Sequence, residues 1–145
     1  MNSPRQKQSG VMLLEALIGI LLFSIGILGM VSMQAASIKA GSDSNYRSEA
    51  SYLANQIIGQ MWTDQTNLPS YSLNAGAVTC AKGSSASNNQ TVTSWLNDAS
   101  RLPGSNSLQQ QIVIDPATNQ VTVTVCWLPP NTKTAHNFVA SSSIN

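Results

Sequence analysis

The sequence predicts an α+β fold in which a long N-terminal helix, transmembrane in its first half, packs on a small antiparallel β-sheet head. Three features lead to this prediction. Residues 11–33 form an apolar run, residues 46–62 carry apolar side chains at helical spacing, and residues 110–127 hold two β-branched segments around a turn. Their order along the chain places the helix before the sheet.

The composition is that of one small domain plus a targeting or anchoring segment. A chain of 145 residues has room for a single core. Charged residues make up 9% of it, far below the roughly 25% of soluble globular proteins. Hydroxyl and amide side chains must therefore keep the C-terminal part in solution, which favours an exported domain over a cytosolic enzyme. The alternative is a low-charge surface that has no bearing on location.

Basic residues beyond the first ten positions are scattered singly. They are Lys39, Arg47, Lys82, Arg101 and Lys133. A nucleic-acid binder normally clusters Lys and Arg on one face, with aromatic residues between them. We therefore expect no nucleic-acid partner.

The N-terminal run has the length and charge pattern of a membrane helix. Val11 to Met33 carries one charged side chain, Glu15, and matches a helix that crosses about 30 Å of hydrocarbon. Arg5 and Lys7 precede the run, so the N-terminus is expected to stay in the cytoplasm. A secretory signal peptide has an apolar region of only about 7–15 residues and a small-residue cleavage site. The run from Val11 to Met33 is too long to fit this description. A plain single-pass anchor fits the length, but it gains nothing from a buried glutamate.

A cut between Gly10 and Val11 would give Glu15 a partner. The new terminal amine of Val11 lies four residues before Glu15, so helical spacing brings the two groups near each other. In an assembly of parallel helices, the amine of one subunit can instead meet Glu15 of another. Such a pair removes the cost of an isolated charge in lipid.

The segment Gly10-Val11-Met12-Leu13-Leu14-Glu15 resembles the processing site of type IV prepilins and pseudopilins. This resemblance implies a type IV pilin-like fold, cleavage after Gly10 by a membrane prepilin peptidase, and methylation of the new N-terminus at Val11. It also implies that Glu15 acts in assembly and subunit recognition. The chain departs from the commonest pattern at Val11, where phenylalanine is more usual.

Small residues interrupt the apolar run. They are Gly19, Ser24, Gly26, Gly29 and Ser32. One interpretation is close helix packing, or local melting of the helix on assembly, because small residues let backbones approach. The other is that glycine is simply common in membrane helices. The sequence leaves both open.

The second half of the long helix is amphipathic. Its predicted apolar face consists of Tyr46, Ala50, Leu53, Ile57 and Met61, with Ala54, Ile58 and Trp62 alongside. The helix is expected to stop near Asn67-Leu68-Pro69. Gly41 to Asn45 is a weak point of this helix, and the sequence leaves open whether the helix kinks, breaks or continues there.

The rest of the chain predicts a mostly β head. Gln110 to Asp115 and Val121 to Trp127 are expected strands, joined by a turn over residues 115–119. His136 to Ala140 is an expected third, short strand. A short helix is predicted from Ser94 to Ser100, capped by Thr93 or Ser94, and a mobile Ser/Asn-rich loop from Ala81 to Thr91.

Two cysteines, Cys80 and Cys126, predict a disulfide, because an even count in an exported chain is typical of oxidising compartments. It would tie the loop region to the central strand. The alternative is two separate buried thiols. A metal site needs more ligands than these cysteines and His136 supply, so no metal and no other cofactor is expected.

The sequence holds no recognisable catalytic constellation, and we expect a non-enzyme. It has one histidine, no Gly-x-Ser-x-Gly elbow and no Gly-rich phosphate loop. His136 is interpreted as a surface or edge-strand residue. Trp62, Trp95 and Trp127 are interpreted as core packing rather than a ligand platform.

Further motifs resemble minor pilins of the PilV type, the type IV pilus modification proteins. They are Leu13 to Ile18, Phe23 to Gly29, Trp95, Leu102-Pro103-Gly104 and Val121 to Trp127. The resemblance implies a leader at 1–10, a transmembrane and filament-core helix at 11–33, an amphipathic second half at 34–66 and a β-rich head at 67–145.

The function implied is that of a minor pilin that primes, caps or modifies a type IV pilus. Its implied partners are the membrane, prepilin peptidase, other minor pilins, the major pilin and a tip adhesin. It would sit in the inner membrane with a periplasmic head before assembly, and in the surface fibre afterwards. The alternatives are a type II secretion pseudopilin, a ligand- or DNA-binding pilin of an uptake system, and a plain anchored domain.

Overall fold

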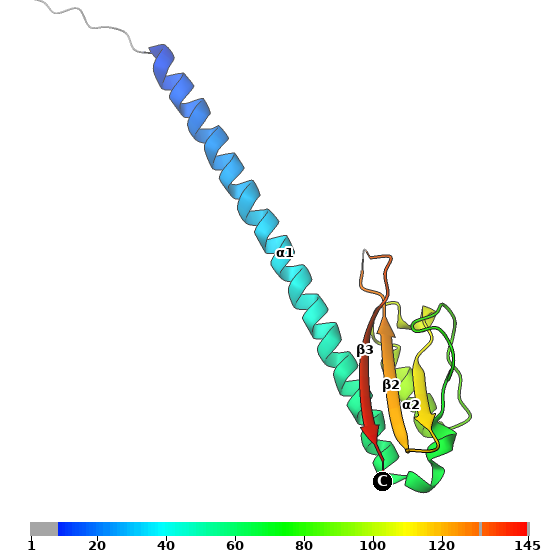
Figure 1. Cartoon of the computed structure of the whole chain (residues 1–145). Coiled ribbons are helices and arrows are strands. Elements are labelled where there is room, and N and C mark those ends of the chain that lie inside the picture. Colours follow the sequence, from blue (N-terminus) through cyan, green and yellow to red (C-terminus); the bar gives the residue numbers. More distant parts are fainter. Residues whose placement is uncertain (1–8, 131, 145) are drawn as a thin grey trace, which may run out of the picture. The chain divides into compact units, whose positions relative to one another are not determined.

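A computed structural model describes residues 9–130 and 132–144. Along the chain, the elements are α1 (Ser9–Thr63), the 3-10 helix η1 (Gln65–Tyr71), α2 (Gln90–Ala99), the 3-10 helix η2 (Ser105–Ser107), β1 (Gln111–Asp115), β2 (Gln120–Trp127) and β3 (His136–Ser143) (Figure 1). The predicted order, a long N-terminal helix followed by a small antiparallel sheet, is confirmed. The chain divides into two compact units after Gly41.

The first unit contains the N-terminal part of α1. All its side chains from Val11 onward are exposed. The predicted weak point at Gly41 to Asn45 is α-helical throughout. Of the predicted leader, residues 1–8 lie outside the described residues, and α1 begins at Ser9.

In the second unit, the C-terminal part of α1 buries the predicted apolar face. The buried residues are Ala50, Leu53, Ala54, Ile57, Ile58 and Met61, and Tyr46 packs partly buried against them. The prediction for Trp62 is wrong, because this side chain is 44% exposed. It lies at the margin of the buried stripe, where the helix surface turns away from the core.

The end of α1 is also earlier than predicted. The helix stops at Thr63, and Asp64 leaves the helical region with φ −131° and ψ 47°. The chain then continues as η1, which contains Pro69, instead of stopping at the proline. This turn brings Leu68 and Tyr71 into the core.

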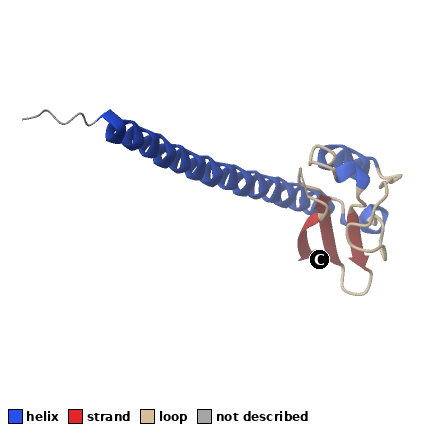
Figure 2. Ribbon diagram, turned by 90° about the horizontal axis from the view of Figure 1, so that it is seen from above, coloured by secondary structure: helices blue, strands red, loops and turns tan. Residues whose placement is uncertain are grey.

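The sheet has the order β1-β2-β3 with both pairs antiparallel (Figure 1). Successive side chains of a strand point to opposite faces, and Val121, Val123, Val125 and Trp127 of β2 share one buried cluster with α1 and α2. Both helices therefore cover the same face of the sheet, and Figure 2 shows the helices and strands of the head as separate layers.

The short helix begins earlier than predicted. Asn89, rather than Thr93 or Ser94, is the N-cap of α2, and its Oδ1 accepts hydrogen bonds from the N–H groups of Thr91 and Val92 at 2.9 and 3.4 Å. Asparagine is among the strongest N-cap residues. Thr93 lies inside the helix and donates its hydroxyl to the carbonyl of Asn89.

The segment predicted as a mobile loop from Ala81 to Thr91 is tied to the head and partly helical. Gly83 N–H donates to the carbonyl of Ser107 at 3.1 Å, and the carbonyl of Ala81 accepts from the N–H of Gln109 at 2.8 Å. Ser85 Oγ accepts from the N–H of Gln110 at 2.9 Å. The last two residues of the predicted loop belong to α2.

The third strand is longer than predicted. It extends to Ser143, because Ser141, Ser142 and Ser143 pair with Thr122, Val121 and Gln120 of β2. The predicted turn before β2 is confirmed. Asp115 caps it by accepting from Ala117 N–H and from the Thr118 hydroxyl, both at 2.9 Å.

Candidate functional site

The apolar run Val11 to Met33 is the feature of the chain that most requires a functional explanation. Among the described residues, one helix is long and apolar enough to cross a bilayer, with a mean hydropathy of 2.6 and none of its apolar window buried. The core helix of a soluble protein can reach the same hydropathy, but its apolar side chains pack inside the protein. Here sixteen large apolar side chains between Val11 and Met33 are exposed and need a surrounding that is not water.

Glu15 lies exposed within this run and is its one ionisable side chain. Apolar neighbours dominate both sides of it, with Leu14 60% and Leu17 67% exposed. An environment that covers these leucines also removes water from the Glu15 carboxylate. The site therefore combines an apolar surface with one charge that needs a partner.

The other polar groups of the run are satisfied within the helix. Ser24 Oγ donates to the carbonyl of Ile20 at 2.7 Å, and Ser32 Oγ donates to the carbonyl of Leu28 at 3.0 Å. A Cβ added at Gly19, Gly26 or Gly29 would meet nothing within 4 Å. Within the part of the chain that the structure describes, no contact therefore requires glycine at these positions.

The Gly10–Val11 peptide bond lies in the first turn of α1. This placement puts Val11 and Glu15 one helical turn apart. A new amine at Val11 would stand at a helix N-terminus with the Glu15 carboxylate one turn further along, near the end at which negative charge is favoured.

Cys80 and Cys126 form a disulfide, with Cα atoms 5.5 Å apart. Cys126 lies on central strand β2, and its side chain points to the face opposite the helices, because the flanking Val125 and Trp127 point into the core. The bond fastens the loop before α2 to that face, as predicted.

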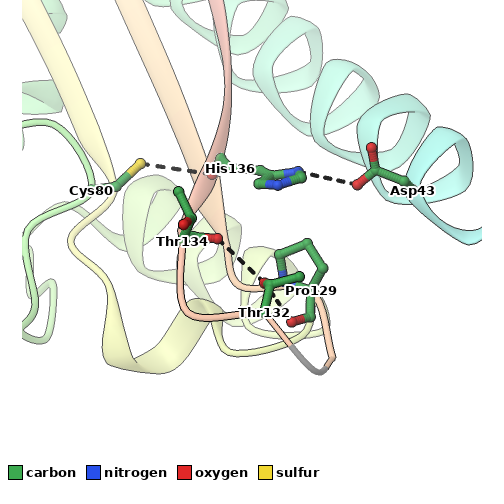
Figure 3. A network of polar contacts seen from close by, with 6 residues as sticks. All are labelled: Asp43, Cys80, Pro129, Thr132, Thr134 and His136. Carbon is green, nitrogen blue, oxygen red and sulfur yellow. Dashed lines mark hydrogen bonds and ion pairs between the residues drawn. The ribbon is translucent and has the colours of Figure 1, made fainter. Parts of the chain in front are cut away.

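A polar cluster that the sequence did not reveal joins α1 to the start of β3 (Figure 3). His136 Nδ1 lies 3.1 Å from Asp43 Oδ1, and the two side chains are 38% and 50% exposed. The imidazole also meets the Trp127 ring edge-on, with centroids 5.8 Å apart. Next along the helix, the Arg47 guanidinium lies 5.9 Å from the centre of the Phe138 ring. A single histidine and an aspartate far apart in sequence carry no signal for this pairing.

The disulfide and the turn before β3 complete this cluster. Cys80 Sγ lies 3.7 Å from the carbonyl oxygen of His136. Thr132 Oγ1 donates to the carbonyls of Pro129 and Thr134 at 2.9 and 3.4 Å (Figure 3). His136 is thus the first residue of an edge strand, as expected, but it also contacts α1.

Two ionisable groups of the head have shifted pKa values. Burial, and then the hydrogen bond to Asp64, raise the pKa of Tyr71, whose hydroxyl donates to Asp64 Oδ2 at 3.0 Å. Hydrogen bonds from the N–H of Ala117 and the hydroxyl of Thr118 lower the pKa of Asp115. Both shifts follow from local turn structure, and neither group lies in a cluster with catalytic geometry.

Within the described ranges, no group of three or more His, Cys, Asp or Glu residues is placed to hold a metal ion. Trp95 and Trp127 are 2% and 1% exposed, and Trp95 Nε1 donates to the carbonyl of Leu53 at 2.9 Å. These two rings are core residues and do not form a ligand platform with Trp62.

No family model matches the sequence, and neither a curated protein nor a solved structure matches it. A functional assignment therefore has to be argued from the apolar helix, Glu15 and the head.

Proposed function

We propose that this chain is a minor pilin, made as a precursor, cut after Gly10 and assembled through its N-terminal helix into a type IV pilus that it primes, caps or modifies. The observation that carries the proposal is the apolar run with one carboxylate: from Val11 to Met33 every side chain is exposed, and Glu15 alone is ionisable. The role is structural rather than catalytic.

Two surroundings can cover such a helix in turn. Before assembly it spans the inner membrane, with the N-terminus in the cytoplasm and the head in the periplasm. After assembly, parallel helices of other pilins, both minor and major, replace the lipid. Because both surroundings are apolar, the helix can move from one to the other without exposing its side chains to water.

Glu15 supports assembly over simple anchoring. A carboxylate inside a membrane span costs at least a few kcal/mol unless it is paired. Cleavage after Gly10 by a prepilin peptidase creates an amine at Val11, which is methylated in the proposed mature subunit. This amine, from the same or a neighbouring subunit, pairs with Glu15 and sets the register between adjacent helices.

The head supplies the partner-specific part of the subunit. Its own core holds the C-terminal part of α1, α2 and the inner face of the sheet, so it presents a stable surface to other minor pilins or to a tip adhesin. Its positive charges are scattered singly along the chain, at Arg47, Lys82, Arg101 and Lys133, and clustered basic residues are what a nucleic-acid partner normally requires.

The first test is the N-terminal sequence and intact mass of the protein from membranes that contain a prepilin peptidase. The wild type is expected to begin at Val11, with or without a methyl group, and Gly10→Val is expected to keep its leader. Gly19→Val is the matched control, because a side chain there meets nothing within 4 Å. A wild type that keeps Met1, or is cut beyond Ala36, contradicts the proposal.

The second test separates assembly from anchoring. Cells expressing Glu15→Ala or Glu49→Ala are compared by the amount of this protein in sheared surface fibres. Both variants remove an exposed glutamate of α1, and only the loss of Glu15 is expected to deplete the fibre fraction. Equal recovery of the two variants would leave a plain anchored domain as the better description.

A further inference from the structure

We propose that the free edge of β3 is a docking site for an uncharged, extended segment of a different polypeptide, which adds a fourth strand to the head sheet. The open edge is a property of the head by itself. The choice of a different polypeptide rests in part on the proposed function, through the shared membrane.

The register of β2 with β3 shows which backbone groups of β3 face outward. Ile144 N–H donates to the carbonyl of Asn119 at 3.0 Å, one step beyond the pair Gln120↔Ser143. Hydrogen-bonded pairs alternate along an antiparallel ladder. The backbones of Phe138, Ala140 and Ser142 therefore bond to β2, and those of Asn137, Val139 and Ser141 point away from it.

The other edge of the sheet sets the same alternation independently. Leu73 and Ile112 exchange two backbone hydrogen bonds, at 2.9 and 3.0 Å. Ile112 thus faces away from β2, so Gln111 and Val113 bond to it. Their partners on β2 are Thr124 and Thr122. The backbones of Val121, Val123 and Val125 are therefore the ones that bond to β3, in agreement with the alternation set by Ile144 and Asn119.

The two edges differ in how far they are closed. Leu73 occupies the outer side of β1 at Ile112. Within residues 9–130 and 132–144, no hydrogen bond reaches the outward backbone groups of Asn137, Val139 or Ser141. The β1 edge is therefore occupied at Gln110 and Ile112, whereas three alternate outward positions of β3 have no such partner in the described part of the chain.

Strand β3 also lacks the usual protection of an edge. Its eight residues contain no Pro, Lys, Arg, Asp or Glu, and they run without interruption of the register. Natural edge strands are normally kept from pairing by charge, proline, a bulge or short length. Val139 is 51% exposed at the middle of the strand. An extended peptide can pair with such an edge, because its backbone presents a hydrogen-bond donor and acceptor toward the edge at every second residue.

A second copy of this chain fits the edge less well than a different polypeptide. The β1 edge of another copy is occupied at Gln110 and Ile112, so its β3 offers the longer open edge. In a symmetric dimer, the outward backbone groups of the two β3 strands would exchange hydrogen bonds across a two-fold axis. Such an axis makes the two β3 strands antiparallel. In the head, α1 and β3 run in the same direction, because Asp43 meets His136 and Arg47 meets Phe138. The C-terminal parts of the two α1 helices, residues 43–63, would then run in opposite directions, whereas the proposed function packs the helices of neighbouring subunits in parallel.

The partner strand is expected to be uncharged and rich in β-branched or hydroxyl-bearing residues. On the face away from the helices, the side chains next to the edge are Thr122, Thr124, Val139 and Ser141. None of them offers a charge to pair with a charged partner. Small hydroxyl and β-branched side chains pack well against such a surface.

The test uses the oxidised full chain in detergent micelles and a blocked peptide with the sequence of Gln120–Val125, which already pairs with β3 on its other edge. Hydrogen exchange of single amides is measured by NMR with and without peptide. The amides of Asn137, Val139 and Ser141 are expected to exchange about tenfold more slowly with saturating peptide. Those of Phe138 and Ala140 already bond to β2 and are expected to stay unchanged.

Val139→Pro is the decisive variant, because it removes an outward donor and leaves the ladder to β2 intact. It is expected to weaken peptide binding at least about tenfold, whereas Val139→Thr, which keeps the N–H, is expected to bind as the wild type does. Unchanged exchange of the Val123 and Val125 amides checks that the variant folds. If it does not fold, Ser141→Lys replaces it and is expected to weaken binding too.

Three outcomes would overturn the proposal. The outward amides exchange equally fast with saturating peptide, or Val139→Pro binds as tightly as Val139→Thr. Alternatively, the same amides become protected as protein concentration rises without peptide, which assigns the edge to a second copy. Leader cleavage and fibre recovery do not enter this measurement, so its failure leaves the proposed function standing. Failure of the proposed function would remove the membrane argument against a second copy and leave the open edge of β3 in place.

Discussion

The side-chain amide of Gln110 completes the backbone ladder of the sheet at Cys126. Cys126 N–H donates to Gln110 Oε1 at 2.7 Å, and Gln110 Nε2 donates to the carbonyl of Cys126 at 3.0 Å. Strand β1 begins only at Gln111, so a side chain takes the place of one further strand residue. The two residues are 2% and 0% exposed, and water cannot replace these bonds.

Gln110→Met is expected to lower the free energy of unfolding by about 2–4 kcal/mol, because it leaves a buried N–H and a buried C=O without partners. Methionine has nearly the same length and shape, so the loss reports the side-chain hydrogen bonds of Gln110, which include a bond from Nε2 to Ser105 Oγ at 2.9 Å. Denaturant unfolding of the oxidised protein measures it. Gln120→Met, at the exposed first residue of β2, is the control, with an expected change within about 0.5 kcal/mol. Equal effects at both positions would show that the pairing adds no stability.

Gly104 is expected to tolerate no side chain. Its φ is +64°, and an added Cβ would lie 2.6 Å from Leu128 Cβ. Gly104→Ala combines the cost of a positive φ, about 1 kcal/mol, with overpacking of about 1–3 kcal/mol. Gly76→Ala is the matched control, because Gly76 has φ +87° but open space around it. The thermal midpoint should fall further for Gly104→Ala, and equal midpoints would rule out the steric part.

The Cys80–Cys126 disulfide is expected to supply a large share of the stability of the head. It closes a loop with a sequence separation of 46, and the chain-entropy model gives about 4 kcal/mol for such a loop. A variant with Cys80→Ser and Cys126→Ser should unfold at much lower denaturant than the oxidised wild type. Reductant should lower the denaturant midpoint of the wild type and leave that of the double variant unchanged. Identical unfolding with and without reductant would show that the bond is dispensable.

Tyr71 is expected to make the head sensitive to alkali. Burial and the hydrogen bond to Asp64 raise its pKa. The folded state thus favours the neutral phenol, and this contribution is complete below the unfolded pKa of about 10 and is lost as pH rises above it. Tyr71→Phe should therefore lose less stability between about pH 9 and pH 11 than the wild type. Tyr52→Phe, at a residue that is 62% exposed, should follow the wild type, and parallel curves for all three proteins would contradict the prediction.

Local patterns in the sequence were sufficient for most elements of the fold. The apolar run at 11–33 and the buried face of residues 50–61 follow from helical spacing. The two β-branched segments around Asp115 became β1 and β2 almost to the residue. The position of Glu15 within the run is likewise read directly from the sequence. These features depend on side chains close together in the chain, so periodicity and turn chemistry reveal them.

Element ends and side-chain partners depended on residues distant in the chain. The polar residues Ser141 to Ser143 became strand because β2 offered them a ladder, and α2 started early because Asn89 was placed to cap it.

The sequence by itself determined that this protein has an apolar run with a single carboxylate, followed by a β-rich head that contains two cysteines. Only the tertiary structure decided that Gln110 completes a strand, that His136 meets Asp43 and that one edge of the sheet stays open. The physical reason is that hydrogen-bond partners are chosen by three-dimensional proximity after the core has formed, whereas propensity and periodicity act within a few residues.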